Sequence, residues 1–241
     1  MQDKQSQIID MFDAIAPKYD MANRAMSLGI DRSWRKEACR LAFKELQSSQ
    51  NIVIADIACG SGDMIASWIR NTHKEAHIGH IYGYDPSQEM LKVAHEKLQN
   101  FSTPKIELLK GEAKALPFEN TSIDILSISF GLRNVLEYEQ ALDEFVRVLK
   151  PGGIIVILEF FKPQNTTLLQ KLMGFYTAKI LPFVGGIISS NLKAYRYLPQ
   201  SMQNFVSVSE LEDLMQKRGM HTLHLKGYSA NVATLYMGVK S

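Results

Sequence analysis

Short apolar runs alternate with helical patterns through the middle of the chain. The runs predict strands over residues 52–57, 78–84, 106–109, 123–128 and 154–158. Between them, apolar residues recur at helical spacing over 87–99 and 137–149, and Ser87 is a suitable N-cap for the first of these helices. Strands that alternate with helices form a mostly parallel sheet with helices on both faces. The pattern therefore predicts an α/β fold.

The two ends of the chain add further elements. Apolar spacing predicts a helix over residues 4–15 that Pro17 stops, and a second helix over 31–47, so residues 1–50 are expected to form a helical cap. After Ser209 we expect a helix through Arg218 and two strands, 221–227 and 232–239, that close the sheet edge. With 241 residues, 46% of them hydrophobic, the chain can bury one core, and we predict a single domain over 1–241.

The overall composition excludes some classes of protein. Two cysteines cannot make a disulfide framework, and no charged-then-apolar leader precedes the first helix, so a cytoplasmic location is expected. A net charge of +2 is too small to indicate nucleic-acid binding. We predict neither a nucleic-acid partner nor a metal site.

Charge is distributed unevenly in one window. Residues 160–209 contain no acidic residue but five basic ones and many aromatic ones. Within this window, residues 168–188 are apolar but interrupted by lysines, which does not fit a membrane-spanning helix. We interpret the window as a lid that touches an anionic membrane transiently. The alternative is a helical insertion buried on the core or in a homodimer.

A glycine loop follows the first predicted strand and opens a helix. It runs from Asp56 through Gly60, Ser61 and Gly62 to Asp63, a context in which a cofactor can approach the backbone. Asp85 ends the next strand, where a carboxylate can accept hydrogen bonds from ribose hydroxyls. A tight turn and a helix-capping carboxylate are the plainer interpretations.

The charges of this loop favour one cofactor over another. Asp63 would repel a pyrophosphate at the helix N-terminus, and Ile65 replaces the third glycine of a dinucleotide fingerprint. S-adenosylmethionine (SAM) carries a sulfonium and an ammonium and no phosphate, so we predict SAM rather than NAD. Glu112 and Ala113, after the third strand, are expected to pack against its adenine, unless they belong to an ordinary surface loop.

The run Phe130-Gly131-Leu132-Arg133-Asn134-Val135 follows the apolar strand that ends at Ser129. In open α/β sheets the ligand crevice lies beyond the carboxyl ends of the strands, so Arg133 and Asn134 are candidates for chemistry. Two local alternatives remain. Arg133 could pair with Glu137, and Asn134 could cap the next helix.

Several motifs together resemble a known family. They lie at residues 12–13, 19–20, 26–31, 56–63, 115–118, 128–135, 147–153, 158–160 and 197–202. Over most of the chain this set closely resembles the UbiE/MenG family of quinone C-methyltransferases. The resemblance implies a class I SAM-dependent methyltransferase (Rossmann-like) fold, and places Ser61, Asp85, Glu112, Ala113 and Ser129 at SAM-contacting positions.

The reaction that the resemblance implies is methylation of a ring carbon of a polyprenyl quinol, in menaquinone or ubiquinone synthesis. Such a carbon becomes nucleophilic when a neighbouring hydroxyl loses its proton. Arg133 would stabilise the phenolate as a fixed cation, because an arginine does not act as a base. The base stays open: Asn134 could hold a water, and Tyr19, Asp20 or Glu159 could line the same space, although Tyr19 could be only a core or lid aromatic.

The chain departs from the family pattern in three places. Ser61 replaces a common threonine, Val206 replaces a proline, and residues 228–233 replace a segment with paired glycines. A methyltransferase for another small molecule and a non-catalytic SAM-binding scaffold are the alternative functions.

Overall fold

The computed structural model describes residues 3–47, 50–72, 75–162, 167–189 and 191–241. In this part of the chain, seven strands form one sheet in the order β3-β2-β1-β4-β5-β7-β6. Their bounds are β1 Ile52–Ile57, β2 Ile78–Asp85, β3 Lys105–Lys110, β4 Ile123–Ser129, β5 Leu149–Glu159, β6 Met220–Tyr228 and β7 Ala233–Lys240. The first five strands are parallel, and β7 runs antiparallel to both β5 and β6. The predicted α/β fold is confirmed.

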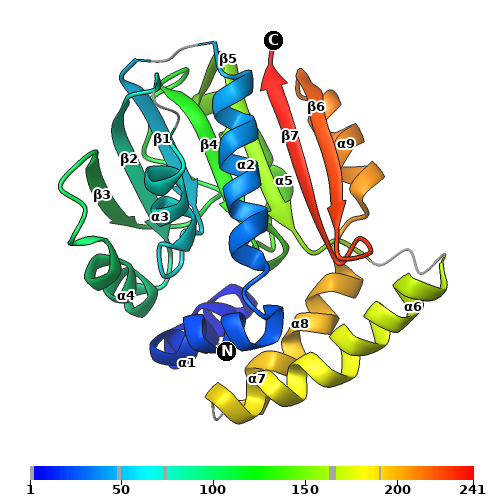
Figure 1. The fold of residues 1–241 in the computed structure, drawn as a ribbon. Helices are drawn as coiled ribbons and strands as arrows, with labels where there is room; N and C mark the ends of the chain where they lie inside the picture. The colour runs from blue at the N-terminus through cyan, green and yellow to red at the C-terminus, as the bar shows by residue number, and fades with distance from the viewer. Residues whose placement is uncertain (1–2, 48–49, 73–74, 163–166, 190) are drawn as a thin grey trace.

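Helices cover both faces of the sheet. On one face lie α2 (Asp31–Glu45), α3 (Asp63–Arg70) and α4 (Gln88–Leu98); on the other lie α5 (Tyr138–Val148) and α9 (Val208–Gln216). Figure 1 shows α2 and α3 in front of the sheet and α5 and α9 behind it. Trp68 is fully buried on the first face and Phe145 on the second. Because both faces are covered, the central strands are mostly apolar on both sides rather than alternating.

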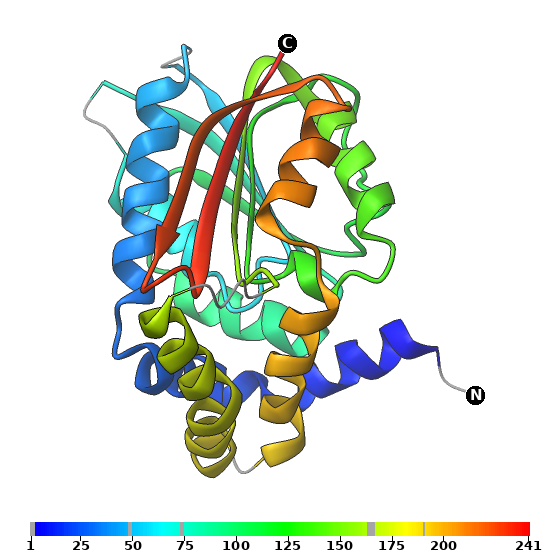
Figure 2. The same ribbon diagram turned by 90° about the vertical axis from the view of Figure 1, so that its right-hand side faces the viewer.

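A further layer of helices lies beyond the carboxyl ends of the parallel strands (Figure 2). It consists of α1 (Lys4–Ser27), α6 (Leu168–Phe175), the π-helical turn η2 (Tyr176–Ile180), α7 (Leu181–Ser189) and α8 (Leu192–Asn204). The helical cap predicted over residues 1–50 is therefore two separate parts in the structure. Only α1 joins this layer, because Trp34 and Ala38 of α2 are buried against the sheet.

The predicted stop at Pro17 is wrong, since α1 continues through it to Ser27. A proline inside a helix removes one backbone hydrogen bond. Here the neighbouring Ile15 and Ala16 are buried, in a cluster that includes Met90 of α4 and Ala194 of α8. Tertiary packing of this kind supplies most of the stability of a helix in a protein, and it outweighs the local cost.

The predicted start of α4 is confirmed, because the Ser87 side chain accepts a hydrogen bond from the Met90 N–H at 3.1 Å. No helix in the described ranges is long and apolar enough to cross a membrane.

Candidate active site

Asp85 stands at the carboxyl end of β2, buried beside the glycine loop. Its two oxygens accept hydrogen bonds from the backbone N–H groups of Gly60 and Ser87, each at 2.8 Å. No ion pair to it appears among the described residues, and burial raises the pKa of Asp85 to about 6. A buried carboxylate without a cation is stabilised by further hydrogen-bond donors. Ribose hydroxyls are such donors.

Seven predicted site residues line one small cavity of about 80 Å³. They are Tyr19, Gly60, Asp85, Glu112, Ala113, Ser129 and Asn134. The buried Oδ1 of Asn134 has no hydrogen-bond partner within the described ranges. It can accept a hydrogen bond from an ammonium group, so the donors and acceptors of this cavity fit SAM.

Asp56 lies outside the lining of this cavity. It is fully buried, and its Oδ1 accepts from the Ser127 hydroxyl at 2.7 Å, which in turn accepts from Trp68 Nε1 at 3.0 Å. Burial raises the pKa of Asp56 to about 7. These hydrogen bonds tie the end of β1, where the loop begins, to β4 and α3. The predicted cofactor contact of Asp56 stays a prediction.

Ser61 and Gly62 also lie outside the lining. The Ser61 hydroxyl donates to Asp20 at 2.5 Å, and Lys97 joins Asp20 to Asp63 at 2.5 and 2.7 Å. Gly62 takes a φ of 81° where α3 begins, a conformation that suits glycine. Burial alone would raise the pKa of Asp63, but neighbouring cations, Lys97 among them, lower it to about 2. The charged loop predicted from sequence is thus tied to α1 and α4.

The backbone at the carboxyl ends of β1 and β4 is strained. Ala58 and Phe130 have φ values of 49° and 58°, the left-handed region that side chains other than glycine rarely adopt. A Cβ on Gly131 would lie 2.5 Å from the Ala58 Cβ. Glycine therefore lets the two turns approach closely beside Phe130, which lines the small cavity.

Arg133 does not pair with Glu137, so that sequence-based alternative is wrong. Glu137 binds Lys114, whereas Arg133 Nη1 lies 2.6 Å from the fully buried Glu159. Arg133 also donates to the Phe130 carbonyl at 2.6 Å and to the Ser201 hydroxyl at 3.3 Å. The guanidinium is held by three acceptors from three segments of the chain.

The other local alternative is also wrong, because the N-cap of α5 is Glu137 rather than Asn134. Asn134 instead ends a short 3-10 turn, η1 (Leu132–Asn134). Two candidate bases are occupied by other contacts: Asp20 by Ser61 and Lys97, and Glu159 by Arg133 and the Phe160 N–H at 2.7 Å.

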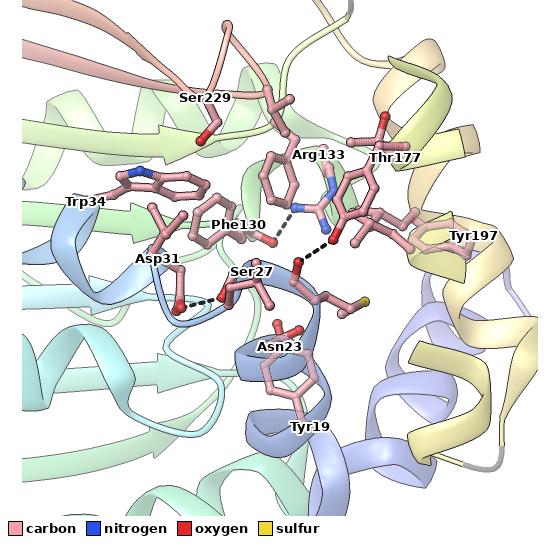
Figure 3. Close-up of a pocket in the computed structure, with 18 of the residues that line it drawn as sticks. Tyr19, Asn23, Ser27, Asp31, Trp34, Phe130, Arg133, Thr177, Tyr197 and Ser229 are labelled. Atoms are coloured by element: carbon pink, nitrogen blue, oxygen red, sulfur yellow. Dashed lines mark hydrogen bonds between the residues drawn. The ribbon is translucent and has the colours of Figure 1, made fainter. Parts of the chain in front are cut away.

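A second, larger cavity of about 340 Å³ lies between α1 and the helices α6 to α8. Figure 3 shows Tyr19, Asn23 and Ser27 on α1, with Arg133 across from them. Arg133 lines this cavity, Asn134 lines the small one, and Tyr19 lines both. The two residues of the 3-10 turn thus line different cavities, and the cavities meet at Phe12, Tyr19 and Phe130, which line both. Desolvation raises the pKa of Tyr19, so its hydroxyl keeps its proton at neutral pH.

Sequence reasoning missed Gln5. Its amide donates to the Asn134 carbonyl at 3.2 Å and accepts from the Leu136 N–H at 3.1 Å, so the start of α1 covers the small cavity. No local pattern indicates a contact between residues so far apart in the chain.

Comparisons with known proteins agree with this geometry. The model of the ubiE/COQ5 methyltransferase family matches residues 1–240. The chain belongs to this family. It is therefore a SAM-dependent C-methyltransferase, and SAM is its methyl donor.

Two curated relatives are similar over nearly the whole chain. The ubiquinone/menaquinone biosynthesis C-methyltransferase UbiE of Campylobacter jejuni is 45% identical over 238 residues, 98% of this chain and 99% of the relative. The demethylmenaquinone methyltransferase of Chlorobaculum tepidum is 36% identical over 235 residues, 98% of this chain and 93% of the relative.

Solved structures support the fold. A SAM-dependent methyltransferase from Thermotoga maritima has a TM-score of 0.60 at 20% identity, covering 97% of this chain and 100% of that one. One from Aquifex aeolicus has a TM-score of 0.58 at 16% identity, covering 84% and 89%. The predicted class I methyltransferase fold is confirmed.

Proposed function

We propose that the acceptor is a polyprenyl quinol of menaquinone or ubiquinone synthesis, with its ring in the large cavity and SAM in the small one. The observation that carries this proposal is the position of η1. Arg133 faces the cavity that is large and mostly apolar, and Asn134 faces the pocket that holds Asp85. A ring carbon at the boundary would meet the methyl group there.

In this arrangement a ring hydroxyl gives its proton to water, and Arg133 stabilises the oxyanion that remains. The ring carbon beside it forms a bond to the methyl carbon, and the pair of the broken C–S bond stays on sulfur. The same ring carbon then releases its proton to water, which restores the aromatic ring, and the ring oxygen takes a proton back from water to give the methylated quinol. When bound, SAM supplies the methyl group and its positive charge. Asp85, Glu112 and Ala113 would hold its adenosine, and Asn134 its ammonium.

The test is transfer of a labelled methyl group from SAM to short-tailed demethylmenaquinol and to a 6-methoxy-benzoquinol, each assayed also as the quinone. We expect methylation of the naphthoquinol, and no methylation of either oxidised form because a quinone has no hydroxyl to ionise. Methylation of both quinols would extend the proposal to ubiquinone synthesis. Methylation of neither would contradict it.

We also propose that the protein is cytoplasmic and docks reversibly on the inner face of an anionic membrane. The helical stretch α6-η2-α7 has two apolar sides. Met173, Thr177 and Leu181 line the large cavity, while on the other side the exposed fractions are 85% for Leu168, 63% for Leu172 and 64% for Phe183. Lys171 and Lys179 are exposed on the same stretch. Apolar residues beside lysines favour an anionic bilayer, and a polyprenyl quinol is dissolved there.

Cosedimentation with phosphatidylglycerol vesicles tests the docking. Leu172→Ser with Phe183→Ser should abolish it, whereas Leu225→Ser, at an exposed leucine on β6, should not. Equal binding of the two variants would contradict the proposal. Loss of a dimer on light scattering, without any vesicle binding by the unsubstituted protein, would assign the surface to a second copy of the chain instead.

A further inference from the structure

The guanidinium of Arg133 is only partly used by the protein. Nη1 donates to Glu159 and to the Phe130 carbonyl, and Nε donates to Ser201. Nη2 makes no hydrogen bond to a described residue, and the side chain borders the large cavity. One edge of the cation is therefore available for an oxygen of a bound molecule.

The helix α8 brings a second donor to this edge. Ser201, which holds Arg133, lies four residues after Tyr197, and residues at this spacing share one face of a helix. Tyr197 lines the same cavity as Arg133 (Figure 3). Its hydroxyl has no hydrogen-bond partner in the described part of the chain. Burial raises the pKa of Tyr197, and although the charge of Arg133 acts against this, the hydroxyl stays protonated at neutral pH.

Several other polar side chains around the cavity have partners within the protein. The Tyr176 hydroxyl donates to the Met26 carbonyl at 3.0 Å, and Ser27 donates to Asp31 at 2.7 Å. Asp31 is also paired with Arg35. These hydroxyl groups are already engaged, whereas the Tyr197 hydroxyl can donate to a bound molecule.

We propose that Tyr197 is a catalytic residue whose hydroxyl donates to the same ring oxygen that Arg133 contacts, so that a cation and a neutral donor together stabilise the oxyanion. This inference rests on the proposed function for the identity of the oxygen. Tyr197 keeps its own proton throughout, and the proton of the ring hydroxyl goes to water. Two donors in a largely apolar cavity stabilise developing charge more than they would in water.

The first test is Tyr197→Phe, with Tyr138→Phe as the matched control because Tyr138 loses the same hydroxyl outside both cavities. We expect kcat for the quinol to fall about a hundredfold in Tyr197→Phe, with KM nearly unchanged. The acid limb of its kcat profile should move to higher pH, because the ring hydroxyl ionises less readily. A profile that coincides with the control, or a change in KM alone, would overturn the inference.

A second test does not need turnover. The absorbance of 4-nitro-1-naphthol, bound with S-adenosylhomocysteine present, reports the ionisation of a phenol in the cavity. Its pKa should be lowered on binding to the unsubstituted protein, and should return towards the free value by about one unit in Tyr197→Phe. Equal bound values in both proteins would overturn the inference. A Tyr197-dependent shift without quinol methylation would leave this oxyanion site in place and reject the proposed substrate.

Discussion

The site contains two buried carboxylates with different partners, one at the end of β2 and one at the end of β5. Asp85 and Glu159 each accept two backbone N–H groups, those of Gly60 and Ser87 in one case and of Arg133 and Phe160 in the other. The difference is a cation. Glu159 also binds the guanidinium of Arg133, whereas Asp85 has no charged partner among the described residues.

Because it lacks a cation, Asp85 is the carboxylate that is available to a ligand. Burial raises the pKa of Asp85 to about 6, so its charge is poorly compensated by the protein alone. A cofactor with hydroxyl groups completes its hydrogen bonding. The charge of Glu159 is already compensated by Arg133, and Glu159 holds the guanidinium in place.

The largest effect should come from breaking the charged pair. Glu159→Ala leaves Arg133 as a buried cation without its partner, and such a change costs about 3–5 kcal/mol in the free energy of unfolding. Asp85→Ala leaves no buried cation without a partner, so its loss in the free energy of unfolding should be much smaller. Urea unfolding of the two variants measures both losses, and equal losses in the free energy of unfolding would contradict this assignment of the two carboxylates.

The next effect concerns chemistry. Arg133→Met should lower the single-turnover rate of quinol methylation about 10²- to 10³-fold, as expected for a lost oxyanion donor. Arg70→Met is the control, since Arg70 is exposed at the end of α3 and stacks on Phe101 at 5.5 Å. If Arg133→Met turns over at the rate of this control, Arg133 has a structural role only.

The smallest effect is a dependence on pH. The native pKa of Asp85 lies above the usual carboxyl value, so the native protein takes up a proton between about pH 6 and the range where unfolded carboxyls titrate. Its stability should therefore rise as pH falls through this window, while SAM affinity should fall about tenfold per unit below pH 6. Asp85→Asn should remove the contribution of Asp85 to the pH dependence of both stability and SAM affinity. The pKa of Asp56 is also raised, to about 7, so Asp56 adds its own pH dependence to both proteins. The quantity to measure is therefore the difference in stability between the unsubstituted protein and Asp85→Asn at each pH.

Part of the site can be predicted from local patterns in the sequence. The alternation of strands and helices, the mostly parallel sheet and the position of Asp85 at the end of the second strand follow from local patterns. The pairing of β1 with β2 then brings Asp85 beside the glycine loop that ends the first strand. The partner of Arg133 does not follow in this way. Glu137 has the right spacing along the chain, but Glu159 lies on the strand next to β4, and only the β4–β5 pairing brings it to Arg133.

The helical layer was predicted least well for the same reason. The apolar pattern of residues 168–188 indicates a buried or interfacial segment, but it does not reveal that one side lines a cavity while the other is exposed. A local rule likewise predicts that the first helix ends at Pro17. The contacts of α1 with α4 and α8, which carry the helix through this residue, come from segments far along the chain.

Calorimetric titration of SAM into Asp85→Ala and Arg133→Met tests the division between the two carboxylates most directly. We predict that Asp85→Ala loses at least about tenfold in affinity, as for a hydrogen bond to a charged group, and that Arg133→Met binds SAM with an unchanged Kd. Unchanged binding by Asp85→Ala, together with lost binding by Arg133→Met, would contradict the assignment of cofactor to Asp85 and of chemistry to Arg133.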